Sequence, residues 1–540
     1  MESLALPSFQ LQVRKDIVEE IIQGKIFSLN EDINILRKFE EEFCNIFFSD
    51  IRQSDSSPDL RAVWEPARLQ HIAALIACIS QNPESHDSKV ARQFARDAVL
   101  KWINNNPFLL GPHYISSMEC GLRIPVFFYC LKSLDTLSTQ EYRLILNSIY
   151  RHAWWISKRL SLYSSLGNHT IAECVGLIFA GAIFRKTGEG RQWLEKGFGL
   201  LKKELDHQIL DDGGPAEQSL NYHRFVLDLY WLSVDFLEKN KLHDCSDIKP
   251  RLVLGENFLN AFQDKSGNFP SIGDSDDGCA IAPGIAPKRF KPEQIKHGIR
   301  VFKKSGYTVI KSDNGVLFTF DHGSLGMSPL YNHGHADALS ITLSKDDKEI
   351  LTDPGTCRYN GEPEFRRYFK GTRAHNTITI DGLDQAVQET GFIWSHAYKT
   401  EILKITEQKD ELFVKASHNG YTRLNSPVRH KRSVLFYNKT TFLIKDTFSG
   451  KGIHDFELNY HLHPDAVCSK NYDWWQIDNQ GAKVFIRLSD ELDFLFVKGQ
   501  EEPLLGWYSP EYGILQKCGV LTCKKRGYAN DISFVTVIST

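Results

Sequence analysis

The first half of the chain places apolar residues three and four positions apart, the spacing of helices that bury one face. This spacing predicts helices in four segments, 32–47, 68–79, 92–104 and 139–160. Turn-forming clusters such as Asn105–Pro107 and Gly188–Gly190 separate the periodic runs. The succession of helical patterns up to residue 290 favours paired antiparallel helices, as in an (α/α) toroid.

The pattern changes after residues 262–291, a stretch crowded with glycine, proline and aspartate. We interpret it as a linker, and its acidic run at 274–277 as a solvated turn, with a cation-binding site as the alternative. Short alternating runs follow at 307–310, 315–320, 377–380, 433–436, 441–444 and 484–488. This alternation is typical of an antiparallel β-sandwich. Since 540 residues exceed one compact core, we predict a helical domain at 1–290 and a β-sandwich domain at 291–540.

Composition and charge restrict the possible partners. The chain is 42% hydrophobic and 24% charged with a net charge of −3, so no general field attracts nucleic acid or membrane. The longest apolar stretch, 171–184, is too short to span a bilayer and predicts a buried helix. The N-terminus shows no secretion signal, so we expect a cytoplasmic protein, or a periplasmic or secreted one if a leader was removed. Eleven scattered cysteines without a CxxC pair predict free thiols.

Three polar clusters in the second half suggest a metal site. They are 332–337 (Asn-His-Gly-His-Ala-Asp), 352–355 (Thr-Asp-Pro-Gly) and 374–377 (Ala-His-Asn-Thr), and each adjoins a β-like run. Strand ends can hold His335, Asp353 and His375 in a fixed geometry, and two imidazoles with one carboxylate are a typical set of Zn²⁺ ligands. His333 would share a face with His335 on a regular strand, so Gly334 must turn the backbone to separate them. The alternative is a hydrogen-bonded turn cluster without metal.

The same clusters, in this order, resemble the C-terminal half of the heparinase II/III-like polysaccharide lyases, which include heparin, heparan sulfate and alginate-type uronate lyases. Gly167-Asn168-His169 and the segment 211–223 (Asp-Asp-Gly-Gly-Pro-Ala-Glu-Gln-Ser-Leu-Asn-Tyr-His) resemble the family's Asn–His pair and its tyrosine-bearing helix. The resemblance covers roughly residues 60–540. It implies an incomplete (α/α) toroid followed by an antiparallel β-sandwich.

The resemblance also implies β-elimination on a uronic-acid-containing polysaccharide or oligosaccharide. Such an enzyme must neutralise the substrate carboxylate, remove the C5 proton and protonate the departing C4 oxygen. The family's catalytic tyrosine falls on Tyr222, as general acid with the base role also open to it. Asn168 and His169 would neutralise the carboxylate, although His169 is also a candidate for the base. His333 is a further basic candidate.

Five residues are candidates for substrate binding, and for each the alternative is a structural or solvated position. They are His223, Arg224, Tyr359, Arg367 and Tyr368. Arginine suits carboxylate or sulfate because it can donate two parallel hydrogen bonds. Spacing does not decide whether Tyr359 or Tyr368 matches the family's second functional tyrosine. The expected metal, one divalent ion and most simply Zn²⁺, would be structural and would support the segment that carries His333.

Two other functions stay open. A uronyl C5-epimerase would share the proton abstraction but return the proton to the other face, and fold alone does not separate the two. A non-catalytic glycan-binding protein of polysaccharide assembly would be expected to lack Tyr222, His169 or His333, whereas all three are present. The sequence leaves open the glycan, endo or exo action and the oligomeric state.

Overall fold

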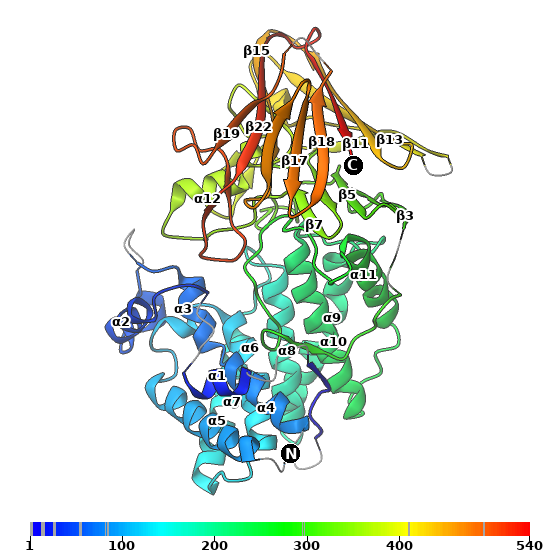
Figure 1. Cartoon of the computed structure of the whole chain (residues 1–540). Helices are drawn as coiled ribbons and strands as arrows, with labels where there is room; N and C mark the ends of the chain where they lie inside the picture. Colours follow the sequence, from blue (N-terminus) through cyan, green and yellow to red (C-terminus); the bar gives the residue numbers. More distant parts are fainter. Residues whose placement is uncertain are drawn as a thin grey trace. The chain divides into compact units, whose positions relative to one another are not determined.

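A computed structural model of the chain describes residues 4–11, 17–24, 29–52, 57–81, 83, 86–293, 295, 297–408, 411–489 and 492–540 (Figure 1). Its contacts divide the chain into two compact units. The helical unit comprises residues 1–208, 224–253 and 277–291. The sheet unit comprises residues 209–223, 254–276 and 292–540, so the chain passes between the units several times.

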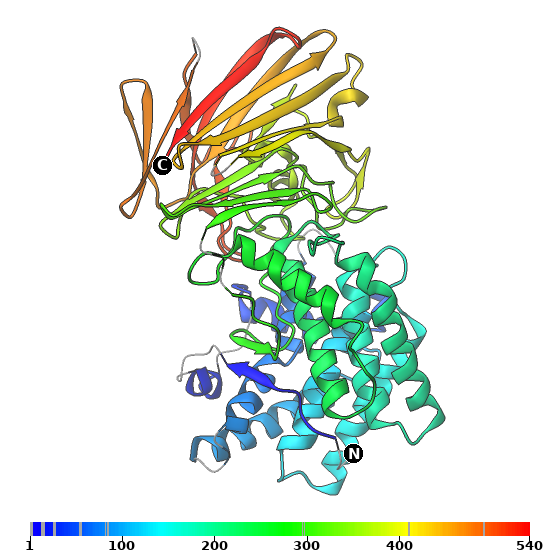
Figure 2. The same ribbon diagram turned by 90° about the vertical axis from the view of Figure 1, so that its right-hand side faces the viewer.

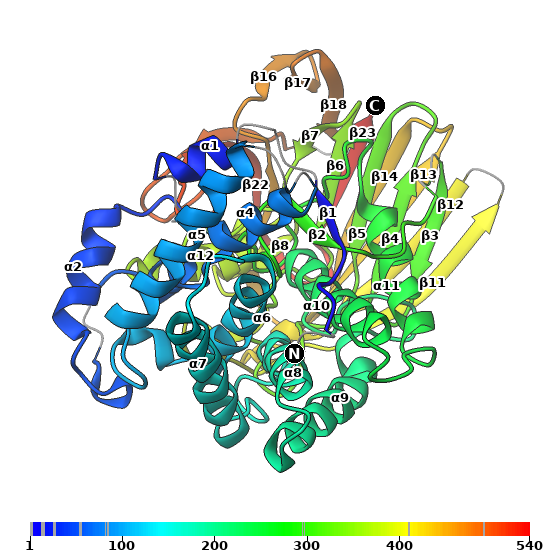
Figure 3. The same ribbon diagram turned by 90° about the horizontal axis from the view of Figure 1, so that it is seen from below.

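The helical unit is an (α/α) toroid, and its four predicted helices are confirmed. Antiparallel neighbours pair as α4 with α5, α6 with α7, and α8 with α9 (Figure 3). Helices α4, α6 and α8 are buried along nearly their whole length, whereas α7 and α9 bury only one face, as expected for inner and outer layers. The helices up to residue 262 are α1 (Ile17–Ile22), α2 (Ile33–Phe43), α3 (Leu60–Ala67), α4 (Gln70–Gln81), α5 (His86–Asn105), α6 (Ser117–Ser133), α7 (Thr139–Lys158), α8 (Asn168–Ile183), α9 (Gly188–Gln208), α10 (Leu220–Lys239) and α11 (Lys249–Phe262). Residues 220–223 of α10 and 254–262 of α11 are grouped with the sheet unit.

Local sequence explains where these helices begin. The Asp32 carboxylate accepts a hydrogen bond from the backbone N–H of Asn34, which caps α2. At α7 the hydroxyl of Ser138 and the carboxylate of Glu141 each accept a hydrogen bond from the other residue's backbone N–H, as in a capping box. No helix in the described part of the chain is long and apolar enough to cross a membrane. All eleven cysteines are free thiols.

The sheet unit is an antiparallel β-sandwich, and all six predicted strands are confirmed. An eight-stranded sheet has the order β11-β12-β13-β14-β23-β18-β17-β16. Two smaller sheets, β3-β4-β5-β6-β7 and β19-β22-β15-β8, pack against it (Figure 2). Phe442 on β14 stacks on Phe318 of β5 at 4.3 Å between ring centroids, and Phe448 lies 4.3 Å from Phe456 of β15. The core of the unit therefore lies between the large sheet and the two smaller ones.

The strands of these sheets have the following bounds. The smaller sheets contain β3 (Gly298–Phe302), β4 (Tyr307–Lys311), β5 (Val316–Asp321), β6 (Ile341–Lys345), β7 (Lys348–Leu351), β8 (Ile378–Ile380), β15 (Ile453–His461), β19 (Leu495–Lys498) and β22 (Gly519–Tyr528). The large sheet contains β11 (Thr400–Gln408), β12 (Glu411–His418), β13 (Val428–Tyr437), β14 (Thr441–Gly450), β16 (Val467–Asn471), β17 (Trp474–Asn479), β18 (Ala482–Leu488) and β23 (Ser533–Ser539). Helix α12 (Pro363–Lys370) lies between β7 and β8 in the sequence.

Candidate functional site

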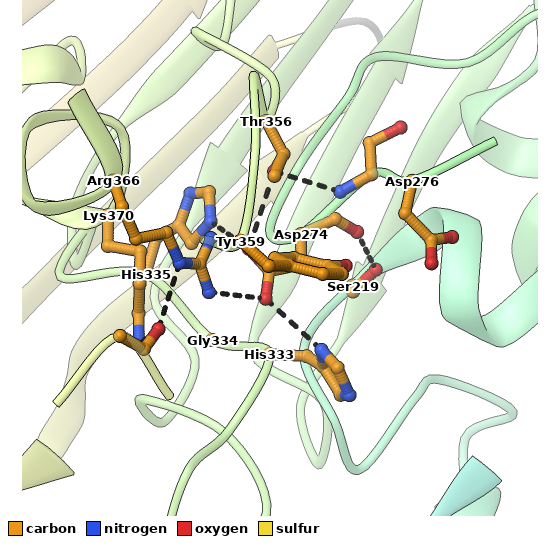
Figure 4. A network of polar contacts seen from close by, with 12 residues as sticks. Ser219, Asp274, Asp276, His333, Gly334, His335, Thr356, Tyr359, Arg366 and Lys370 are labelled. Atoms are coloured by element: carbon orange, nitrogen blue, oxygen red, sulfur yellow. Dashed lines mark hydrogen bonds and ion pairs between the residues drawn. The ribbon is translucent and has the colours of Figure 1, made fainter. Parts of the chain in front are cut away.

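The centre of the candidate site is Asp274, a fully buried carboxylate in the sheet unit (Figure 4). Arg366 donates to both of its oxygens, with Nη2 2.9 Å from Oδ2. His333 Nδ1 lies 3.1 Å from Oδ2, and His335 Nε2 lies 3.1 Å from Oδ1. Burial by itself would raise the pKa of Asp274, but the Arg366 guanidinium and the two histidine hydrogen bonds hold it well below its usual value. The prediction of a solvated turn at 274–277 is therefore wrong for Asp274.

Backbone contacts fix Asp274 between two other parts of the site. The Ser219 hydroxyl, just before α10, donates to the Asp274 carbonyl at 2.6 Å. The Asp274 N–H donates to the His333 carbonyl at 2.9 Å. The predicted turn at Gly334 is present, because residues 332–337 form no strand. A Cβ atom on Gly334 would lie 1.5 Å from the Leu325 carbonyl oxygen, so only glycine fits there.

The Asp274 carboxylate gives the two histidines different proton arrangements. An ionised carboxylate only accepts hydrogen bonds, so His333 carries a proton on Nδ1 and His335 carries one on Nε2. Burial lowers the pKa of His335 to about 4, which keeps that ring neutral near pH 7. A neutral His335 has its lone pair on Nδ1, and a neutral His333 has its lone pair on Nε2. One carboxylate thus prepares the two rings for separate tasks.

Tyr222, in the first turn of α10, is the second focus of the site. Its hydroxyl donates to Asp276 Oδ2 at 3.0 Å and lies 2.8 Å from the hydroxyl of Tyr359. Because a phenol has one proton, Tyr359 is then the donor to the Tyr222 oxygen. The His333 ring stacks on the Tyr222 ring at 3.8 Å between centroids. Tyr359 therefore provides a hydrogen bond that would stabilise negative charge on the Tyr222 oxygen.

The structure places Tyr368 and Arg367 in different surroundings from Tyr359 and Arg366. The Tyr368 hydroxyl accepts a hydrogen bond from the backbone N–H of Gly506 at 3.0 Å, so it fastens that loop. Tyr359, and not Tyr368, is the tyrosine that contacts Tyr222. Arg367 is exposed, whereas its neighbour Arg366 is buried against Asp274. Successive residues of a helix point about 100° apart, so α12 directs the two arginine side chains to different sides. The helical periodicity of this segment is the sequence signal that could have selected Arg366 as the buried one.

The other predicted residues lie on α8 and α10. Asn168 is buried and His169 half-buried in the first turn of α8, which Gly167 precedes with a φ of 138°. The His223 ring is buried against Phe258, with 5.6 Å between ring centroids. Asn168, His169 and Arg224 belong to the helical unit, whereas His223 belongs with Tyr222 to the sheet unit.

His335, Asp353 and His375 form a buried group in which one ligand atom from each residue lies within 4.8 Å of the others. His375 Nδ1 lies 3.1 Å from Asp353 Oδ2. Within the described part of the chain, His335 Nδ1, Asp353 Oδ1 and His375 Nε2 have no hydrogen-bond partner. Buried polar atoms are rarely left without partners, and each residue contributes one such atom. The donor set and its geometry therefore fit a divalent cation.

A buried arginine braces the backbone beside these three residues. Arg432 Nη1 donates to the Leu339 carbonyl at 2.7 Å and to the Asn376 carbonyl at 2.6 Å, while Asp446 accepts from its Nε at 2.7 Å. The Asn376 side chain donates to the carbonyl of Thr352 at 2.9 Å. The segments that carry His335, Asp353 and His375 are thus cross-linked by hydrogen bonds that the sequence did not reveal.

Comparison with known proteins gives consistent matches along most of the chain. The heparinase II/III N-terminus family model matches residues 68–247, and the heparinase II/III-like, C-terminal model matches residues 294–534. A heparin-sulfate lyase of Bacteroides stercoris is 26% identical over 358 residues, 60% of this chain and 49% of that protein. One from Bacteroides thetaiotaomicron is 24% identical over 426 residues, 67% of this chain and 56% of that protein. The chain thus spans about half the length of the curated relatives it matches.

Solved structures show the same fold at low sequence identity. A crystal structure of heparinase III superposes with a TM-score of 0.70 and 16% identity, covering 97% of this chain and 88% of that one. The heparan sulfate lyase of Pedobacter heparinus superposes with a TM-score of 0.59 and 18% identity, covering 97% and 87% of the two chains. The toroid followed by a β-sandwich is therefore the architecture of these proteins.

Proposed function

Because the chain belongs to the heparinase II/III-like family, we propose that it is a polysaccharide lyase that cleaves a uronic-acid-containing anionic glycan by β-elimination. The main support is the group around Tyr222, whose hydroxyl contacts Tyr359 and Asp276 and whose ring stacks on His333. The relatives named heparin-sulfate lyases favour a sulfated glycosaminoglycan as the first substrate to test.

In the proposed reaction, His333 Nε2 takes the C5 proton of the uronate and Tyr222 gives its phenolic proton to the C4 oxygen. The C4–O bond breaks with its electron pair moving to that oxygen, and a C4–C5 double bond forms without water. The hydrogen bond from Tyr359 stabilises the resulting Tyr222 phenolate. Proton transfer from His333 to Tyr222 restores the starting state. Asp274 keeps the accepting lone pair of His333 on Nε2.

The resemblance assigns neutralisation of the substrate carboxylate to Asn168 and His169. Negative charge on that carboxylate grows when the C5 proton leaves, so this help is largest in the transition state. His169→Ala should therefore lower kcat about 10²-fold and change KM less, in steady-state kinetics. His207→Ala, an exposed histidine on α9, is the matched control and should leave both constants unchanged. An effect on KM alone would assign His169 to ground-state binding.

An absorbance assay tests the proposed reaction. The unsaturated uronate product absorbs in the near ultraviolet, whereas the product of a C5-epimerase does not. We expect absorbance to rise with heparan sulfate or another polyuronate in a panel of anionic glycans. Exchange of the C5 hydrogen with deuterated solvent, without absorbance or chain cleavage, would instead identify an epimerase. No reaction with any polyuronate would favour the non-catalytic glycan-binding alternative.

We further propose that His335, Asp353 and His375 hold one divalent ion, with Zn²⁺ expected from two nitrogen donors and one oxygen donor. Support comes from the three buried ligand atoms that have no hydrogen-bond partner within the described residues. When bound, the ion would neutralise a buried carboxylate and join three chain segments. The ion would act structurally. By holding His335, which also contacts Asp274, it would fix the segment that carries His333 two residues away.

Metal analysis of the purified protein should find one divalent ion per chain. Chelation should lower the melting temperature by about 5 °C, because a ligand that binds only the native state stabilises it. His335→Ala should reproduce the chelated state, and His333→Ala should lose activity with the metal still bound. A protein without a divalent ion, and indifferent to chelator in melting temperature and rate, would show that the three residues form only a hydrogen-bonded cluster.

A further inference from the structure

The outer face of the eight-stranded sheet carries an unusual concentration of positive charge. Side chains alternate along each strand, and those that point inward, such as Val434 and Ile444, join the core. Among the outward positions, Lys404 lies opposite Lys415, Lys415 opposite Ser433, and Ser433 opposite Lys445. Three lysines therefore lie in one row across β11, β12, β13 and β14, with about 5 Å between neighbouring strands.

The charge on this face is mostly of one sign. The four central strands β13, β14, β23 and β18 present no acidic side chain outward, and every position on them is described. Their outward basic residues are Arg429, Lys431, Lys445, Lys483 and Arg487. Outward acidic residues occur only on the outlying strands: Glu401 on β11, Glu411 on β12 and Asp478 on β17.

This concentration of charge is not explained by stability. Like charges directly opposite each other on neighbouring strands are unfavourable, as for Lys404 and Lys415. Neither of these lysines, nor Lys445, forms an ion pair with an acidic side chain of the described residues. The chain as a whole has a net charge of −3, so the face differs in sign from the molecule that carries it. An anionic partner would relieve the repulsion.

An apolar row runs beside the lysine row. Phe413 lies opposite Leu435, Leu435 opposite Leu443, Leu443 opposite Val537, and Val537 opposite Arg487. At the end of the row, the Arg487 guanidinium lies 4.8 Å from the centre of the Trp474 ring. Sugar rings have apolar C–H faces and, in uronates and sulfated sugars, anionic substituents at their edges. The lysine row and the apolar row together fit a polysaccharide made of such sugars.

We propose that this outer face, defined by Lys404, Lys415, Lys445, Arg487 and the apolar row beside them, is a second, non-catalytic binding surface for a linear anionic polysaccharide. Charge complementarity selects a polyanion. Between Phe413 and Trp474 the apolar row is aliphatic, so it lacks the succession of aromatic rings on which single-stranded nucleic acid stacks, whereas it can contact the C–H faces of sugars. The surface would hold a long polysaccharide while the Tyr222 site acts on one part of that polysaccharide. Binding of the polysaccharide to the outer face does not depend on the proposed reaction.

The test compares two triple variants in a Tyr222→Phe background, which prevents cleavage of the probe. One carries Lys404→Ser, Lys415→Ser and Lys445→Ser. The other carries Lys89→Ser, Lys101→Ser and Lys203→Ser, three exposed lysines of the helical unit, and has the same net charge. Binding of long-chain heparin should weaken about tenfold in the first variant and by less than twofold in the second. The salt dependence of heparin binding should also decrease in the first variant and stay unchanged in the second. Equal affinities in the two variants would overturn the proposal.

Two further measurements separate a glycan-binding surface from a surface that binds any polyanion. In an otherwise unchanged chain, the same lysine substitutions should leave cleavage of a short heparin oligosaccharide unaltered, because a short chain does not reach both sites. Equal or tighter binding of single-stranded DNA of matched charge, with the same loss on substitution, would make the face a general polyanion surface and refute the assignment to glycan. If the triple variant does not fold, Lys445→Ser alone should weaken heparin binding two- to threefold, and no change would count against the proposal.

Discussion

Replacing Tyr222 with phenylalanine should lower turnover about 10³-fold or more while leaving folding and substrate binding nearly intact. The change removes one hydroxyl, and with it the proton that the departing C4 oxygen needs. A factor of 10³ corresponds to about 4 kcal/mol of transition-state stabilisation, within the range of a general acid. The Tyr222 ring and its stacking on His333 stay in place, so the substrate should still bind.

Two further tyrosine variants show whether the effect is specific. Tyr359→Phe removes the hydrogen bond to the Tyr222 oxygen but not the proton donor, so a smaller loss of about 10- to 10²-fold is expected. Tyr230→Phe is the matched control, since Tyr230 lies on the same helix and donates to the Leu201 carbonyl inside the helical unit. It should retain full activity. Turnover of Tyr222→Phe within a few fold of the wild type would remove Tyr222 from the mechanism.

Most of the fold could be predicted because local periodicity reflects burial. The three- and four-residue spacing of 139–160 matches α7, and the alternation of 441–444 lies in β14. The grouping of residues 209–223 and 254–276 with the sheet unit could not be predicted. It depends on contacts between segments far apart in the sequence, such as the hydrogen bond from Ser305 to Asp212, which no local pattern records.

The candidate site was predictable only where its residues adjoin recognisable strands. The clusters of His335, Asp353 and His375 stand out because each adjoins a strand, and the structure brings the three together. Asp274 was missed because an aspartate in a glycine- and proline-rich stretch resembles a solvated turn. Its partner Arg366 lies 92 positions away, so sequence alone did not indicate that the carboxylate is buried and paired.

Asp274→Asn should reduce both activity and stability, because the carboxylate accepts hydrogen bonds from four side chains at once, those of His333, His335, Thr356 and Arg366. An amide offers one acceptor oxygen, and its NH₂ group would face an N–H of His333 or His335. One ring must then change tautomer, and if His333 does so, the lone pair on Nε2 is lost. The same substitution in the catalytic aspartate of serine proteases lowers kcat by about 10⁴-fold, and we expect a loss of 10²-fold or more.

The stability effect of Asp274→Asn follows from Arg366, whose buried guanidinium would lose its counter-ion. Breaking a buried ion pair from one side costs about 3–5 kcal/mol. The pKa of Asp274 is depressed in the folded protein, so its stabilisation is complete above the usual carboxyl pKa near 4 and is lost as the pH falls toward the folded value. The difference in unfolding free energy between wild type and variant should therefore be steady from about pH 5 to 8 and shrink below about pH 4.

Glu119→Gln provides the control that separates the two effects. Glu119 is also a buried carboxylate that binds an arginine through both oxygens, here Arg68 at 2.7 and 2.8 Å, but it lies in the helical unit. Glu119→Gln should lower the free energy of unfolding, measured by chemical denaturation, by about as much as Asp274→Asn does. At temperatures where both variants are folded, Glu119→Gln should keep nearly full kcat and Asp274→Asn should not. Equal kcat values for the two folded variants would mean that Asp274 only holds the structure together and does not orient His333.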